Sequence, residues 1–236
     1  MQNSRHKYPE WSIAQYENLS KMYNTVKDVY NNNAEEGKPN TEIAVLYPMV
    51  NLSANNDFDS LYDTENKIKV DDINIDGHNV VYIKNEYEQM VNQGTEYICV
   101  WHNHLQGTWF STEDIRTLFT LKHLTSLVVD SGNELLVLHK TQETIEKMSK
   151  IENTPNYDAA YTGNIADFIV SKFIEYEQRA VNLCVKLFGA YYSDVDSYYA
   201  FRELVLNETF RIFEENFSTR YFSIPKHIGS KFLFDT

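Results

Sequence analysis

The stretch that decides the fold is residues 96–116, Glu-Tyr-Ile-Cys-Val-Trp-His-Asn-His-Leu-Gln-Gly-Thr-Trp-Phe-Ser-Thr-Glu-Asp-Ile-Arg. Its first part, residues 97–101, is apolar, β-branched or aromatic throughout, which is typical of a strand buried on both faces. A short turn with Gly107 follows, and Ser111-Thr-Glu-Asp114 then opens a segment with apolar residues at helical spacing. We therefore predict a strand that runs through a short loop into a helix.

Two histidines, His102 and His104, end the predicted strand. Side chains two positions apart in a strand point to the same face, with Cα atoms roughly 6–7 Å apart, so both imidazoles can reach one cation. Asn103 points to the opposite face. Asp114 lies in the first turn of the predicted helix and can face back toward the histidines.

The composition indicates a folded protein that does not bind nucleic acid. The 236 residues, 42% of them hydrophobic, suffice for one large domain or a domain with an appendage. The net charge of −13 would repel a phosphate backbone. The two cysteines, Cys99 and Cys184, occupy apolar positions and are interpreted as core residues that form no disulfide.

We also expect no membrane association and a cytoplasmic location. No run of about 18 apolar residues is present to cross a bilayer. The N-terminal residues lack the apolar segment of a signal peptide.

The order of the predicted elements indicates an α/β domain over residues 1–141, with a mixed sheet flanked by helices. The pattern predicts a helix at 10–30, a strand at 41–47 that begins beside Glu42 and closes at Pro48, strands at 68–70 and 80–83, helices at 85–92 and 112–124, and a hairpin of strands at 126–130 and 135–139.

The character of the chain changes after residue 141. Residues 142–152 are predicted to be helical, and two long amphipathic helices are predicted at 165–188 and 195–217, so residues 142–236 form a helical C-terminal extension. Its apolar faces could pack on the sheet domain, pair with a second copy as a homo-oligomer, or hold a substrate. Core packing is favoured, because apolar stripes on helices usually face a core.

Two imidazoles and a carboxylate are a suitable ligand set for catalytic zinc, which commonly has three protein ligands and one open position. His102, His104 and Asp114 are the candidate ligands. Zinc would lower the pKa of a bound water and polarise a substrate carbonyl. Ser111 could donate a hydrogen bond to the oxyanion of the tetrahedral intermediate.

Hydrolysis by a zinc-bound water also needs a general base, and that base cannot be one of the zinc ligands. Glu42 is favoured because it lies at the start of a predicted strand, well upstream of the histidines. Glu86, Glu88 and Glu96 remain alternatives on sequence alone.

Each of these signals alone is weak. A His-x-His pair in a strand is usually structural or exposed, and Ser-x-x-Asp is more often just a helix cap. Together, in strand, turn and helix order and with an upstream glutamate, they favour a metal site.

The combined pattern of Glu42, His102-Asn-His104 and Ser111-Thr-Glu-Asp114 resembles the JAMM motif of the JAB/MPN metallopeptidases, over about residues 10–141. The resemblance implies that the histidines and the aspartate hold Zn²⁺, that the glutamate is the acid/base and that the serine assists the oxyanion. It also implies a mixed sheet with cytidine-deaminase-like layering. Family members cleave isopeptide bonds to ubiquitin or ubiquitin-like tails, or other peptide and amide bonds, so we expect a protein or peptide substrate.

Two features depart from the family pattern. The family usually has proline after the second histidine and seven residues before the serine, whereas here Leu105 follows and six residues intervene. Gly107 relaxes the turn, so the shorter loop can still close. Two other functions stay open: a non-catalytic MPN-like interaction module that uses the C-terminal helices, and a metal site that only stabilises the fold.

Overall fold

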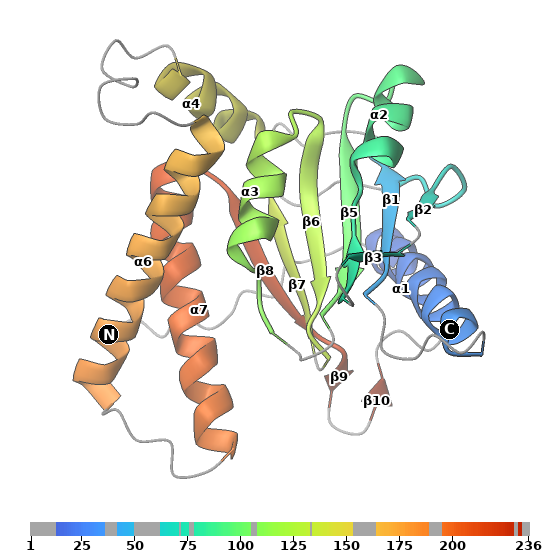
Figure 1. Ribbon diagram of the computed structural model, residues 1–236. Coiled ribbons are helices and arrows are strands. Elements are labelled where there is room, and N and C mark those ends of the chain that lie inside the picture. Colours follow the sequence, from blue (N-terminus) through green and yellow to red (C-terminus); the bar gives the residue numbers. More distant parts are fainter. Residues whose placement is uncertain are drawn as a thin grey trace.

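The structure of the protein is a computed structural model that describes residues 13–35, 42–49, 62–70, 72–75, 78–104, 108–132, 134–152, 164–188, 195–228 and 231–232. Its centre is a six-stranded mixed sheet in which β5 and β6 are parallel and all other neighbours are antiparallel (Figure 1). The strand order is β2 (Ile68–Val70), β1 (Ala44–Pro48), β5 (Ile98–Asn103), β6 (Leu124–Asp130), β7 (Glu134–His139) and β8 (Arg220–Pro225).

Helices lie on both faces of this sheet. They are α1 (Ile13–Glu35), α2 (Lys84–Asn92), α3 (Thr112–Thr120), α4 (Gln142–Glu152), α6 (Ile165–Phe188) and α7 (Val195–Phe217). Two further pairs of short strands are β3 (Asp72–Ile75) with β4 (His78–Val81), and β9 (His227–Ile228) with β10 (Lys231–Phe232). The predicted fold class, a mixed sheet flanked by helices, is confirmed at this level.

The alternation of side chains along the strands divides the core into two layers. Leu46 and Val100 point to one face and pack with α3, α6 and α7. Tyr47 and Trp101 point to the other face and pack against α1. Figure 1 shows the same division, with α3, α6 and α7 on one side of the sheet and α1 on the other. Because His102 follows the parity of Val100, it belongs to the α3 face.

The predicted elements differ from the observed ones mainly in strand pairing. Strands are predicted at 68–70 and 80–83. In the structure β2, at 68–70, pairs with β1, and the second strand is β4, at 78–81, which forms a separate hairpin with β3, at 72–75. The hairpin of β6 and β7 is confirmed. Its turn contains Gly132 with a φ of +88°, a conformation that favours glycine.

The C-terminal region is less separate from the sheet than the sequence indicated. The two long helices have the predicted bounds, and their buried face shares one core with the sheet, through Phe173 of α6 and Phe210 of α7. After α7 the chain returns to the sheet as β8, a strand that the sequence analysis did not predict. A single apolar core therefore extends across the predicted boundary at residue 141.

A buried lysine closes the C-terminal end of α3. Lys140 is 1% exposed, and its Nζ donates to the carbonyl oxygens of Leu118 at 2.8 Å and Leu121 at 3.2 Å. The last carbonyls of a helix have no partner within the helix, and a cation there also interacts favourably with the helix dipole. Burial lowers the pKa of Lys140 to about 7. This contact fixes one end of the helix whose other end carries Asp114.

Cys99 and Cys184 are both buried with free thiols, so the interpretation of both as core residues is confirmed. In the part of the chain that the structure describes, none of the helices combines the length and apolar character needed to cross a membrane.

Candidate metal centre

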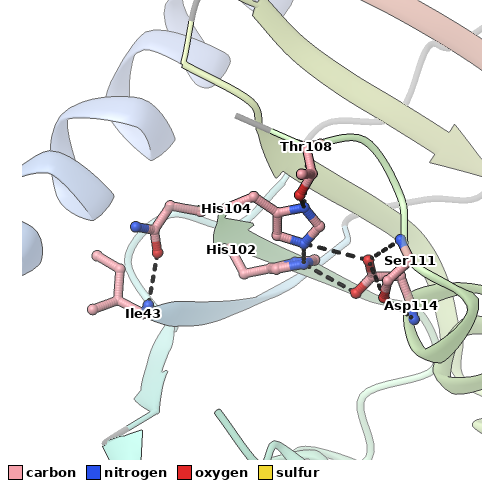
Figure 2. A network of polar contacts seen from close by, with 7 residues as sticks. Ile43, His102, His104, Thr108, Ser111 and Asp114 are labelled. Carbon is pink, nitrogen blue, oxygen red and sulfur yellow. Dashed lines mark hydrogen bonds and ion pairs between the residues drawn. The ribbon is translucent and has the colours of Figure 1, made fainter. Parts of the chain in front are cut away.

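The end of β5 and the first turn of α3 bring the three predicted ligands together (Figure 2). His102 Nε2 lies 3.1 Å from Asp114 Oδ1, and His104 Nε2 lies 3.3 Å from Asp114 Oδ2. The two Nε2 atoms are 3.0 Å apart. Among the described residues, this is the group of histidine, cysteine and acidic side chains that could hold a metal ion.

The position of Asp114 follows from the way in which α3 begins. Ser111 is the N-cap residue, and its Oγ accepts a hydrogen bond from the Asp114 backbone N–H at 3.1 Å. In return, Asp114 Oδ2 accepts from the Ser111 backbone N–H at 2.6 Å and from the Ser111 hydroxyl at 2.8 Å. The helix-cap interpretation is thus confirmed. The same bonds orient the Asp114 carboxylate toward the histidines.

Strand pairing places Glu42 on the histidine side of the sheet. In the antiparallel register of β1 and β5, Ala44 lies opposite His102. The register continues beyond the strand, because Ile43 N–H donates to Asn103 Oδ1 at 2.7 Å and Asn103 N–H donates to the Ile43 carbonyl at 3.4 Å. One further step sets Glu42 opposite His104, and opposite residues share a face. Its charge acts on the His104 imidazole.

The competing glutamates lie elsewhere. Glu96 precedes β5, at the end opposite to His102, and six extended residues separate these two by about 20 Å. Glu86 and Glu88 belong to α2, which leads into that same distant end of β5. Of the four candidate bases, Glu42 is the one beside the triad.

The loop before Ser111 is held by the C-terminal helices. Phe110 is 1% exposed, and its ring meets the ring of Phe210 on α7 edge-on, with centroids 5.4 Å apart. The guanidinium of Arg202, also on α7, lies 4.7 Å from the centroid of the Trp109 ring. Residues 105–107 lie outside the described residues. The end of the shortened loop is therefore anchored by residues about 100 positions away, which sequence reasoning missed.

The contacts of His104 direct its Nε2 at the centre of the triad. His104 Nδ1 lies 3.1 Å from the Thr108 carbonyl oxygen and 3.1 Å from the Thr108 hydroxyl. An Nδ1–H that donates to the carbonyl leaves the lone pair of Nε2 facing Asp114, which is the tautomer that a metal ligand needs.

The pKa values of His104 and Asp114 show that these two groups interact. Burial lowers the pKa of His104, but the hydrogen bond and charge of Asp114, the Thr108 carbonyl and the charge of Glu42 outweigh it, so this pKa is raised above 6.5. Burial raises the pKa of the Asp114 carboxyl, yet the charges and hydrogen bonds of both histidines hold it well below its usual range. His104 and Asp114 therefore stabilise each other's charged forms.

The geometry fits zinc. Bonds of about 2.0–2.1 Å in a tetrahedral arrangement place ligand atoms about 3.3 Å apart. The 3.0 Å between the two Nε2 atoms and the 3.1 Å from His102 Nε2 to Asp114 Oδ1 are close to that spacing, while His104 Nε2 lies 3.3 Å from the other carboxylate oxygen, Oδ2. With one atom from each side chain, the three ligand atoms lie within 4.8 Å of one another. Three protein ligands leave the fourth position for water or substrate. The same three groups can alternatively share protons, so protons and zinc compete for the centre.

This competition predicts that zinc affinity rises with pH. Because the pKa of His104 is raised in the folded protein, its charged form stabilises the metal-free fold. That contribution to stability is complete below about pH 6.5 and is lost as the pH rises through the raised pKa of His104. Zinc needs the neutral imidazole, so the zinc dissociation constant should fall about tenfold from pH 6 to pH 8. Competition with a zinc-binding dye measures this dissociation constant at each pH. A zinc affinity that does not depend on pH would contradict the assignment of His104 as a ligand.

Comparisons of the chain with protein-family models, with curated proteins and with solved structures give no match. The chemistry of the centre therefore has to follow from its own side chains. These are two imidazoles and an aspartate that can hold a metal ion, a glutamate beside them that can carry a proton, and a serine hydroxyl bonded to the aspartate.

Proposed function

We propose that the protein is a zinc-dependent hydrolase of the JAB/JAMM type, which cleaves a peptide or isopeptide bond with a metal-activated water. The observation that carries the proposal is the convergence of His102, His104 and Asp114 with Glu42 on the same face of the sheet. This is the constellation that the motif resemblance implies. The mixed sheet with helices on both faces is consistent with the family's layering.

Each residue has a distinct role. Zinc, when bound, supplies Lewis acidity and lowers the pKa of a coordinated water. His102, His104 and Asp114 hold it. Glu42 accepts a proton from the water that attacks the amide carbonyl, and it returns that proton to the amine when the C–N bond breaks.

Ser111 has two roles in this proposal, the helix cap and the oxyanion donor, and separate measurements of stability and turnover on one variant distinguish them. Its hydroxyl donates to Asp114 Oδ2 at 2.8 Å, so it must turn away from Asp114 to donate to an oxyanion. Ser111→Ala should lower the free energy of unfolding by about 1 kcal/mol through the lost cap, and kcat by about 10²-fold through the lost donor. Denaturant unfolding and steady-state kinetics measure the two effects. Ser111→Thr keeps the hydroxyl and should retain most of both. A drop in stability with unchanged kcat would leave only the capping role.

Metal analysis tests the proposal most directly. Protein purified without any chelator should contain about one zinc ion per chain by mass spectrometry. Peptides and isopeptide-linked ubiquitin-like substrates should be hydrolysed by this protein, the activity should vanish on chelation, and added zinc should restore it. Folded protein that never met a chelator and holds no zinc would rule the proposal out.

The second candidate function is the non-catalytic interaction module. The observation that favours it is a set of exposed large apolar side chains on α6 and α7, namely Ile174, Leu183, Leu187 and Leu204. Self-association through these helices can be measured by analytical ultracentrifugation. Equal association of the wild type and His104→Ala, with no turnover of any substrate by either, would favour the module over the hydrolase.

A further inference from the structure

A cavity of about 320 Å³ lies at the same end of the sheet as the candidate metal centre. One wall is a face of α1 that carries Tyr23, Lys27 and Tyr30. The opposite wall comes from residues at the ends of the strands, including Asn103, His104, Asp130 and Lys226. The cavity is thus on the α1 side of the sheet, whereas the triad is on the α3 side.

His104 connects the two sites. It follows the last residue of β5, its imidazole belongs to the triad, and it also lines the cavity. Its backbone N–H donates to the Asp130 carbonyl at 2.9 Å, which joins the metal ligand to the cavity wall. A substrate that crosses the end of the sheet beside His104 can therefore touch the metal centre and the cavity at once.

The cavity is cationic in a protein that is strongly acidic. Two lysines and one aspartate line it, although the whole chain has a net charge of −13. Lys226 is 6% exposed, its Nζ lies 2.5 Å from Asp130 Oδ1, and it sits 5.2 Å from the centroid of the Tyr23 ring. An ammonium has three N–H donors. No second acceptor for Lys226 is found among the described residues, so donors remain for a ligand.

Lys27 adds a second positive charge from the α1 wall, where it is exposed. The lining thus has more lysines than acidic residues, and a concave site with a net positive charge concentrates anionic ligands. The volume is close to the lower end of the range for ligand sites, about 300 Å³, which suits a group the size of one amino-acid residue. The tyrosine rings and the Asn103 amide supply apolar and hydrogen-bonding surface around such a group.

We propose that this cavity is a specificity pocket for a carboxylate-bearing residue of the substrate next to the scissile amide. The inference rests on the proposed hydrolase function for its purpose, but binding of the carboxylate by the lysines does not require the metal. It assigns to the protein an acidic peptide substrate, with the carboxylate held by Lys226 and Lys27.

Binding of matched small probes to the full chain tests this pocket. N-acetyl-L-glutamate α-amide and its neutral isostere N-acetyl-L-glutamine α-amide are titrated into metal-free protein, and the backbone amide signals are followed by NMR. The acidic probe should bind more tightly and should shift the signals of residues that line the cavity. Equal binding of the two probes, or shifts confined to other parts of the chain, would overturn the proposal.

Lysine variants locate the interaction. Lys27→Gln should weaken binding of N-acetyl-L-glutamate α-amide about two- to fivefold, as expected for one exposed charge. Lys21→Gln is the matched control, because Lys21 is exposed on the same helix and does not line the cavity; it should change nothing. Equal effects of the two variants would indicate that the anionic probe is attracted to the helix in general, and this result would overturn the pocket proposal.

Zinc separates this proposal from the proposed function. If the acidic probe binds only to zinc-loaded protein and His104→Ala abolishes that binding, the carboxylate is a metal ligand and the pocket proposal fails. If the protein binds no zinc but still prefers the acidic probe at the cavity, the hydrolase proposal fails and the carboxylate site stands.

Discussion

Replacing Glu42 with glutamine is expected to abolish hydrolysis while leaving the zinc content of the protein unchanged. Glutamine keeps the size and hydrogen-bonding capacity of the side chain but cannot take a proton from water. General acid–base catalysis contributes about 10²–10⁴-fold, so kcat should fall by at least about 100-fold. Glu42 lies opposite His104 across the strand pair and is not part of the ligand triad, which is why zinc should remain.

The matched control is Glu88→Gln, an exposed glutamate on α2 at the far end of the sheet. It removes the same charge and should leave both zinc content and kcat at wild-type values. Zinc content is measured by mass spectrometry and turnover by steady-state kinetics on the same preparations. If Glu42→Gln turns over substrate normally with zinc bound, the general base is another group and the role of Glu42 is wrong.

The candidate site was predictable because its ligands are close in sequence. The alternation of a strand sets His102 and His104 on one face, and the cap of a helix points Asp114 back at them. Both rules are local, so they need no knowledge of the rest of the fold. Ser111-Thr-Glu-Asp114 can be both a helix cap and part of a metal site. The two interpretations are compatible, because the capping bonds themselves orient the Asp114 carboxylate.

What could not be predicted depends on contacts between distant parts of the chain. The register that brings Glu42 opposite His104 is a property of strand pairing, and it is secured by the bond from Ile43 N–H to Asn103 Oδ1. The packing of Phe110 against Phe210 and the cap that Lys140 gives to α3 likewise leave no trace in local patterns. β8 was missed because its six residues are mostly half-buried and show no clear alternation.

Zinc is expected to stabilise the wild-type protein strongly and His104→Ala not at all. A ligand that binds only the folded state stabilises it by about 4 kcal/mol at a free concentration 1,000 times its dissociation constant. For a chain of this size each kcal/mol corresponds to about 2–4 °C, so zinc should raise the Tm of the wild type by about 10 °C. Removal of one of three ligands lowers zinc affinity until this shift disappears.

The comparison has to be made within each variant, with and without zinc, because His104→Ala also removes the contact with Asp114 that stabilises the metal-free fold. His123→Ala is the matched control. His123 lies at the opposite end of β5, where its Nδ1 contacts the Glu96 carbonyl at 2.9 Å, so the zinc shift should persist in this variant. Differential scanning calorimetry in a buffer that does not bind zinc gives the three zinc-induced shifts in Tm. If His104→Ala gains as much stability from zinc as the wild type, zinc binds elsewhere and the triad is not the metal centre; if only the wild type and His123→Ala gain it, the imidazole of His104 is a ligand.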